Sequence, residues 1–324
     1  MNESNVAYRA DDRNSRKKTK FETTYLNYLD FYLRQFEQYL LTPQNQIQAL
    51  QQQSQKIWQN DRFTEDQRLK QVAANAKSFL QINSNKDLMY RLEVSGIYIV
   101  EKDLGMAIDA YSTWTIDQRP FIVLGNLKKS AVRRNFDLAH ELGHLLLHTQ
   151  IDMTELSKQE YRIIEKQANT FASFFLLPEA QFCKDFSALT HRSNPDAYID
   201  LKQKYLVSIA AIEVRAYNAK LMTYQENRYF YGLMNKKGYR TFEPLDDQIR
   251  PVQPGKIKSL FETILNHDVL NFTDFLSEFS ITPDFLIRLF NLPTKFFDQF
   301  MTPQHHYFDH AQIISFKSKQ LIEN

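Results

Sequence analysis

Apolar residues recur at helical spacing over most of the chain and form strand-like runs only in its middle. Residues 26–40 carry Leu or Phe every three or four positions, which predicts an amphipathic helix ending near Pro43. A capping-box pattern at Thr64 and Gln67 begins another helix with an apolar stripe over 69–80. Short apolar segments rich in β-branched residues predict three strands, at 97–101, 110–115 and 121–124. The pattern therefore predicts a mostly helical α+β fold with a small three-stranded sheet.

Two apolar helices are predicted after these strands. The first begins near Ser130 and runs past Leu146. The second covers residues 163–177, where apolar positions recur at 164, 168, 171, 172 and 175, and Pro178 ends it. Two more helices, at 197–205 and 208–220, are joined by a short turn. Their apolar stripes favour packing in the core over reading DNA.

Prolines at 244, 251 and 254 mark a predicted boundary before a Phe-rich helical tail. This tail is predicted either to bind a partner or to pack against the 26–40 helix. The glutamine-rich segment 44–59 is interpreted as a solvated helix or linker. The predicted organisation is a basic disordered tail (1–20), an N-terminal helical arm (21–60), a central domain (61–245) and a C-terminal helical domain (246–324).

Composition excludes several classes of protein. The 324 residues include 40 Lys or Arg and 38 Asp or Glu, so the net charge of +2 indicates no polyanionic partner. The single cysteine excludes a disulfide within the chain and fits a reducing compartment. We find no signal-peptide pattern in the first 20 residues and no apolar run near the ~18 residues of a membrane span. We therefore expect a cytoplasmic protein that does not enter a membrane.

The predicted helix at 130–146 carries the pattern His140-Glu141-x-x-His144. Residues four apart lie on the same face of a helix, so both imidazoles can reach one metal ion. Glu141 is placed to act as the general base on an attacking water molecule. Apolar residues surround these three at helical spacing, which indicates a buried helix. Buried titratable groups require a reason, and a Zn²⁺ site with His140 and His144 as ligands provides one.

A catalytic zinc site needs a third protein ligand. Glu165 lies on the second apolar helix with Asn169 one turn later on the same face. We predict that Glu165 is this ligand and that the amide of Asn169 hydrogen-bonds a ligand histidine. Glu160 is the alternative ligand, although its polar neighbours indicate a solvated position.

The remaining histidines are interpreted as lying outside the metal site. His148 is eight residues after His140, a rise of ~12 Å along a helix, which is too far for both to bind one zinc. It is predicted to face the helix dipole at the C-terminal end. Three histidines near the end of the chain, His305, His306 and His310, are interpreted as incidental.

These motifs resemble the ImmA/IrrE metallopeptidase family. The resemblance rests on AHELGHLLLH at 139–148, followed by E-x-x-A-N-x-F-A-x-x-x-L-L-P at 165–178. The segments 109–112, 119–124, 133–136 and 205–211 agree with it, and it covers about residues 60–245. It implies a zincin-like fold, a zinc endopeptidase activity and a sheet whose edge holds an extended substrate.

The resemblance also implies a substrate, namely a helix-turn-helix transcriptional repressor of a mobile-element, stress-response or toxin–antitoxin system. Many members carry an N-terminal helix-turn-helix domain. None is recognisable here, so we expect no direct binding to nucleic acid. The alternative function is a non-proteolytic regulatory protein that binds a partner and has a structural or vestigial zinc site. Glu141 favours the enzyme, because a structural site does not need a general base. The sequence leaves the oligomeric state open.

Overall fold

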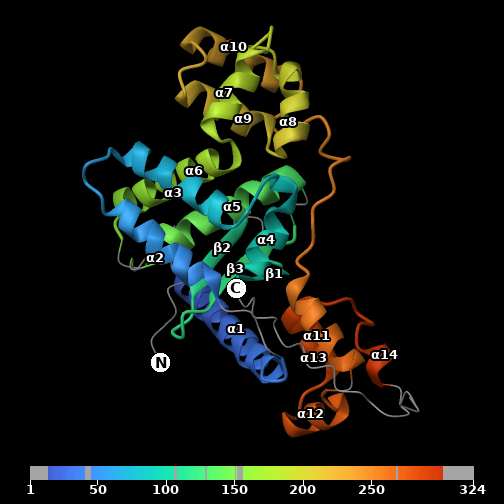
Figure 1. Ribbon diagram of the computed structural model, residues 1–324. Coiled ribbons are helices and arrows are strands. Elements are labelled where there is room, and N and C mark those ends of the chain that lie inside the picture. Colours follow the sequence, from blue (N-terminus) through green and yellow to red (C-terminus); the bar gives the residue numbers. More distant parts are fainter. Residues whose placement is uncertain are drawn as a thin grey trace, which may run out of the picture.

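The three apolar segments in the middle of the chain form one mixed sheet, as predicted. The strands are β1 (Tyr98–Lys102), β2 (Ala110–Trp114) and β3 (Pro120–Gly125). The computed structural model describes residues 14–40, 45–105, 108–127, 130–149, 151, 156–267 and 269–301. The sheet order is β1-β3-β2, with β3 parallel to β1 and antiparallel to β2. The fold is α+β and mostly helical, in agreement with the sequence (Figure 1).

Both faces of the sheet are buried, because alternate residues of a strand point to opposite sides. One face contributes Ile99, Ile122 and Leu124 to the larger apolar core. The other face belongs to a second apolar core, to which it contributes Tyr98, Val100, Tyr111, Phe121 and Val123. The sheet therefore separates two layers of helices.

The larger core is built by the two helices that follow the sheet, α5 (Ala131–Leu147) and α6 (Lys158–Leu176). They are joined there by α2 (Gln46–Trp58), α3 (Glu65–Phe79) and α4 (Leu88–Val94). The 3-10 turn η1 (Asn85–Asp87) directly precedes α4. The predicted capping box of Thr64 and Gln67 begins α3. The glutamine-rich segment is the packed helix α2 rather than a solvated one, because it buries Ile47 and Leu50 against α3 and α5.

Helices after α6 gather on the side of the molecule away from the second core (Figure 1). They are α7 (Glu179–Ser187), η2 (Pro195–Tyr198), α8 (Ile199–Tyr205), α9 (Ile209–Asn218) and α10 (Tyr224–Lys236). Ile209 and Ile212 of α9 are buried in the larger core, so the α8–α9 pair packs as predicted. The sequence analysis did not predict α10, which buries Phe230 and Met234.

The second core is made by both ends of the described chain. It combines α1 (Asn14–Glu37), α11 (Lys256–Asn266), α12 (Phe272–Glu278), α13 (Pro283–Phe290) and α14 (Asp298–Met301). The Phe36 ring lies 4.5 Å from that of Phe261 and 4.4 Å from that of Phe275. The C-terminal helices thus pack against α1, which is one of the two arrangements expected for them. Residues 14–20, predicted within a disordered tail, are helical, and residues 1–13 lie outside the described part.

The segment before α11 is tied to the larger core by two buried acidic side chains. Glu93 accepts hydrogen bonds from the backbone N–H groups of Gly255 at 3.0 Å and Lys256 at 2.9 Å, where α11 begins. Glu101 pairs with Arg134 of α5, which also donates to the Val252 carbonyl at 3.1 Å. The predicted domain boundary at residue 246 stays a prediction. Within the described ranges, no helix has the length and apolarity to cross a membrane.

Candidate metal centre

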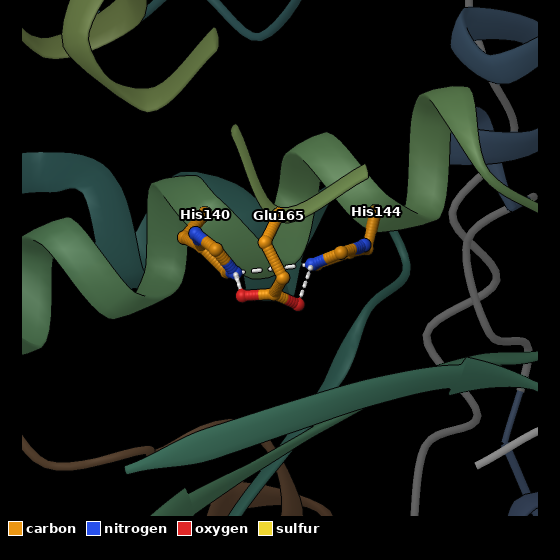
Figure 2. Close-up of side chains that lie close together, drawn as sticks. All are labelled: His140, His144 and Glu165. Carbon is orange, nitrogen blue, oxygen red and sulfur yellow. Dashed lines mark hydrogen bonds and ion pairs between the residues drawn. The ribbon is translucent and has the colours of Figure 1, made fainter. Parts of the chain in front are cut away.

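Helices α5 and α6 bring three of the predicted site residues together. His140 and His144 lie one turn apart on α5, with their Nε2 atoms 3.0 Å from each other. Glu165 on α6 places Oε2 3.6 Å from His140 Nε2 and Oε1 3.4 Å from His144 Nε2. Figure 2 shows the carboxylate between the two rings, with one oxygen towards each. Among the described residues these three form a group that could hold a metal ion.

A glycine in the middle of the motif lets the two helices approach each other closely. A Cβ atom on Gly143 would lie 2.9 Å from Cδ1 of Phe171 and 3.5 Å from Cα of Ala168. Phe171 and Ala168 belong to the buried apolar stripe of α6 and are fully enclosed. Gly143, directly before His144, therefore lets α6 approach α5 closely enough to present Glu165 to the histidines.

The separation of the three donor groups suits zinc. Ligand atoms bound tetrahedrally at 2.0–2.1 Å lie roughly 3.3 Å apart, and the three separations here are 3.0, 3.4 and 3.6 Å. His140 Nδ1 lies 3.0 Å from the amide oxygen of Asn169, which only accepts, so the proton of a neutral His140 ring resides on Nδ1. Its Nε2 lone pair then faces the centre of the group. A cation bound at that centre could accept both Nε2 lone pairs.

The electrostatic environment favours the metal-binding forms of these side chains. Burial lowers the pKa of His140 below its usual value, although the charges of Glu141 and Glu165 act in the opposite direction. Burial alone would raise the pKa of the Glu165 carboxyl, but interactions with His144, His140 and Tyr161 outweigh it and lower the pKa to about 2. A neutral imidazole and an ionised carboxylate are the states in which these groups bind zinc.

Glu141 is buried beside the metal-binding group and is hydrogen-bonded to the sheet. Its Oε2 accepts from the hydroxyl of Ser112 on β2 at 2.6 Å, and its backbone oxygen lies 3.1 Å from the same hydroxyl. A hydroxyl has one proton to donate, so the shorter contact with the carboxylate receives it. Ser112 ends the segment 109–112 that agrees with the family resemblance, but the sequence assigned it no role, and it precedes Glu141 by 29 residues.

His148 ends α5, as predicted, but it does not act as a charged group at the helix dipole. Burial, together with the neighbouring His144, lowers the pKa of His148 to about 3, so the ring is neutral. Its Nδ1 lies 3.0 Å from His144 Nδ1, and its Nε2 lies 3.1 Å from Oε1 of Gln167 on α6. The sequence missed this contact because the relative rotation of α5 and α6 is a property of their packing.

Glu160, the alternative third ligand, does not belong to the group. It is exposed in the first turn of α6, where its carboxylate accepts from the Ser157 N–H at 2.9 Å and completes a capping box. His305, His306 and His310 lie outside the described residues. The roles of His140, Glu141, His144 and Glu165 in catalysis stay predictions that this geometry supports.

Comparison with known proteins gives a family for the centre of the chain. Residues 92–217 match the family of IrrE N-terminal-like domains, which are classed as peptidases. The matched segment begins in α4, contains the whole sheet and ends in α9, so it includes every residue of the candidate centre. No curated protein matched the chain.

Proposed function

We propose that this chain, whose residues 92–217 match the IrrE N-terminal-like family of peptidases, is a zinc-dependent endopeptidase. The observation that carries the proposal is the convergence of His140, His144 and Glu165 at separations that suit one zinc ion. Glu141, the residue beside the first ligand, is the second requirement of a hydrolytic site. The family match supports a peptidase, and the donor set supports the metal.

The side chains divide the work of hydrolysis. His140, His144 and Glu165 would hold the ion, while Asn169 keeps the His140 ring oriented. Zinc at this position would supply Lewis acidity towards the attacking water and the scissile carbonyl. The Glu141 carboxylate accepts the proton of the water and returns it to the departing amine.

We propose that the substrate is a helix-turn-helix transcriptional repressor. This part of the proposal is supported by the resemblance to ImmA/IrrE proteins. The sheet gives it a physical route, because β2 is an outer strand of the sheet and carries Ser112, the partner of Glu141. An extended peptide lying along β2 would pass the catalytic carboxylate.

Elemental analysis of zinc-replete protein tests the centre. We expect one zinc per chain in the wild type, none in Glu165→Ala, and one in Glu141→Gln, whose ligands are intact. In the second step, each protein is incubated with a purified helix-turn-helix repressor encoded beside its gene, and fragments are identified by mass spectrometry. Only the wild type should produce them. Glu141→Gln is the matched control, because it has the same metal and the same shape.

The two measurements also distinguish the proposed endopeptidase from the alternative, a non-proteolytic regulatory protein. A protein that holds zinc and binds the repressor, yet leaves it intact at every concentration, would be a non-proteolytic regulator with a structural site. Wild-type protein without zinc would contradict the metal centre itself. Cleavage by Glu141→Gln at the wild-type rate would remove Glu141 from the role of general base.

A further inference from the structure

A continuous line of hydrogen bonds runs from the candidate metal centre to the start of α3. His144 Nδ1 lies 3.0 Å from His148 Nδ1, and His148 Nε2 lies 3.1 Å from Gln167 Oε1. The amide nitrogen of Gln167 in turn donates to Glu65 Oε2 at 2.8 Å. His148 and Gln167 are buried, with 4% and 9% of their surface exposed, so water does not readily replace either partner.

The protons along this line have one arrangement that satisfies every contact. A carboxylate accepts and does not donate, so Glu65 requires the NH₂ group of Gln167 and directs the Gln167 oxygen towards His148. That oxygen requires an N–H at His148 Nε2, which leaves a lone pair on Nδ1 of the neutral ring. His144 must then donate from its own Nδ1. Its Nε2 lone pair is thereby directed at the metal centre.

The two ligand histidines are thus fixed by different means. His140 donates to the amide oxygen of Asn169, which can only accept. His144 donates to an imidazole nitrogen, which accepts in one tautomer and donates in the other. With the wrong tautomer of His148, two N–H groups would face each other at 3.0 Å. His144 therefore needs a further residue to fix the state of its partner, and Gln167 provides it.

We propose that His148 and Gln167 are positioning residues of the metal centre, which set the tautomer of His144 so that its Nε2 atom is available to the ion. The proposal rests on the proposed zinc site for its role in metal binding. The arrangement of protons is a separate property, which exists without metal and can be measured there.

Zinc affinity, measured by competition with a chromophoric chelator, tests the role in binding. Partners that orient a ligand histidine typically change metal affinity ~10–100-fold when removed. We expect that loss for His148→Leu and for Gln167→Leu. His148→Asn places an amide oxygen where it can accept from His144, so it should recover most of the lost affinity. An affinity of His148→Leu equal to that of the wild type would overturn the proposal.

A matched variant controls for disturbance of the helix end. Gln55 donates to the carbonyl groups of Leu146 and Leu147 at 2.7 and 3.1 Å, so it supports the same end of α5 without touching a histidine. Gln55→Leu should bind zinc within about twofold of the wild type. A loss as large as that of His148→Leu would show that stability of the helix end, and not the tautomer, is what matters.

The proton positions are read from nitrogen-15 NMR spectra of the imidazoles in metal-free protein. We expect His144 protonated at Nδ1 and His148 at Nε2, with both states becoming mixed in Gln167→Leu. A wild-type His148 protonated at Nδ1 would overturn the inference even if zinc binds. The expected tautomers in a protein that binds no zinc would leave the hydrogen-bonded line established, and would contradict only the proposed function.

Discussion

At the scale of single residues, the candidate centre depends on polar side chains outside the set of proposed ligands. Ser112 holds the Glu141 carboxylate, and Asn169 holds the His140 ring. Each is a polar contact in a largely enclosed site, where a hydrogen bond is stronger than in water. Removing either contact should change the orientation of the Glu141 carboxylate or of the His140 ring, and with it the activity or the metal binding, without changing the fold.

Ser112→Ala should lower the rate of cleavage and leave zinc binding intact. The hydroxyl donates to Glu141 at 2.6 Å, and Glu141 is not one of the three proposed ligands. Loss of a hydrogen bond to a charged group is worth about 1.5–3 kcal/mol, which corresponds to roughly a 10- to 100-fold fall in kcat/KM. Ser112→Thr keeps the hydroxyl and serves as the control. Equal activity of the alanine variant and the wild type would show that Glu141 is oriented by other contacts.

Titration of Lys77 should make the free energy of unfolding depend on pH in the alkaline range. Burial lowers the pKa of Lys77 from 10.5 to about 8, although its ammonium donates to Asn85 Oδ1 and to the Phe175 carbonyl. Between pH 8 and 10.5 the folded protein has released this proton and the unfolded chain still binds it. The free energy of unfolding then rises with pH, by at most about 1.4 kcal/mol per pH unit.

Urea denaturation at pH 7.5, 9 and 10.5 measures this effect against Lys77→Met, which lacks the titrating group. The free energy of unfolding of the wild type should rise relative to that of Lys77→Met as the pH rises. A difference that stays constant over this range would show that Lys77 titrates at its ordinary pKa.

At the scale of elements, the close packing of α5 against α6 positions the residues of the candidate metal centre. The two histidines are fixed on α5 by helical geometry, whereas Glu165 reaches them only because α6 packs directly against α5. At Gly143, an added Cβ would lie 2.9 Å from Cδ1 of Phe171 on α6. The element pair is therefore more sensitive to added volume at this position than at other glycines.

Gly143→Ala should destabilise the protein and weaken zinc binding together. The new methyl group would press on Cδ1 of the enclosed Phe171 at 2.9 Å, and overpacking of this kind costs about 1–3 kcal/mol. The same displacement moves α6 and with it Glu165. Gly232 of α10, with nothing within 4 Å of its added Cβ, gives the opposite control. Gly232→Ala should stabilise α10 by roughly 0.5–1 kcal/mol. Equal unfolding midpoints of the two variants would contradict the packing argument.

At the scale of the whole molecule, two apolar cores lie on opposite faces of one sheet. The metal centre is built on the larger core, and the helices at the two ends of the described chain cover the other face. Tyr25 of α1 donates to the Leu289 carbonyl of α13 at 2.9 Å, which joins segments 264 residues apart in the sequence. Loss of packing in the second core should therefore destabilise both α1 and the C-terminal helices.

Phe36→Ala should reduce the free energy of unfolding by about 3–5 kcal/mol, the usual cost of removing a fully buried phenylalanine. Its ring has no exposed surface and contacts α11 and α12. Tyr28 on the same helix is 53% exposed, so Tyr28→Ala should change stability by less than about 0.5 kcal/mol. Urea denaturation followed by circular dichroism compares the two. Similar losses would indicate that α1 does not depend on this core.

Local patterns in the sequence predicted the local structure because they report forces that act within a few residues. The strands were found within two residues of their ends, the Thr64 capping box is present, and α5 begins after Ser130. The helix at 224–236, which buries Phe230 and Met234, was not predicted. Helix α2 was interpreted as a solvated helix or linker because glutamines dominate its sequence, and only a few apolar residues among them are buried.

The sequence by itself determined the pairing of His140 with His144, because the turn of a helix fixes the relation of residues four apart. The polar neighbours of Glu160 also favoured Glu165 as the third ligand, but the distance of Glu165 from the histidines was decided by the tertiary structure. The same holds for the contact of Ser112 with Glu141 and for that of Gln167 with Glu65, which are 29 and 102 residues apart. No local geometry relates residues so far separated, and only the packing of helices and sheet around the two cores brings them together.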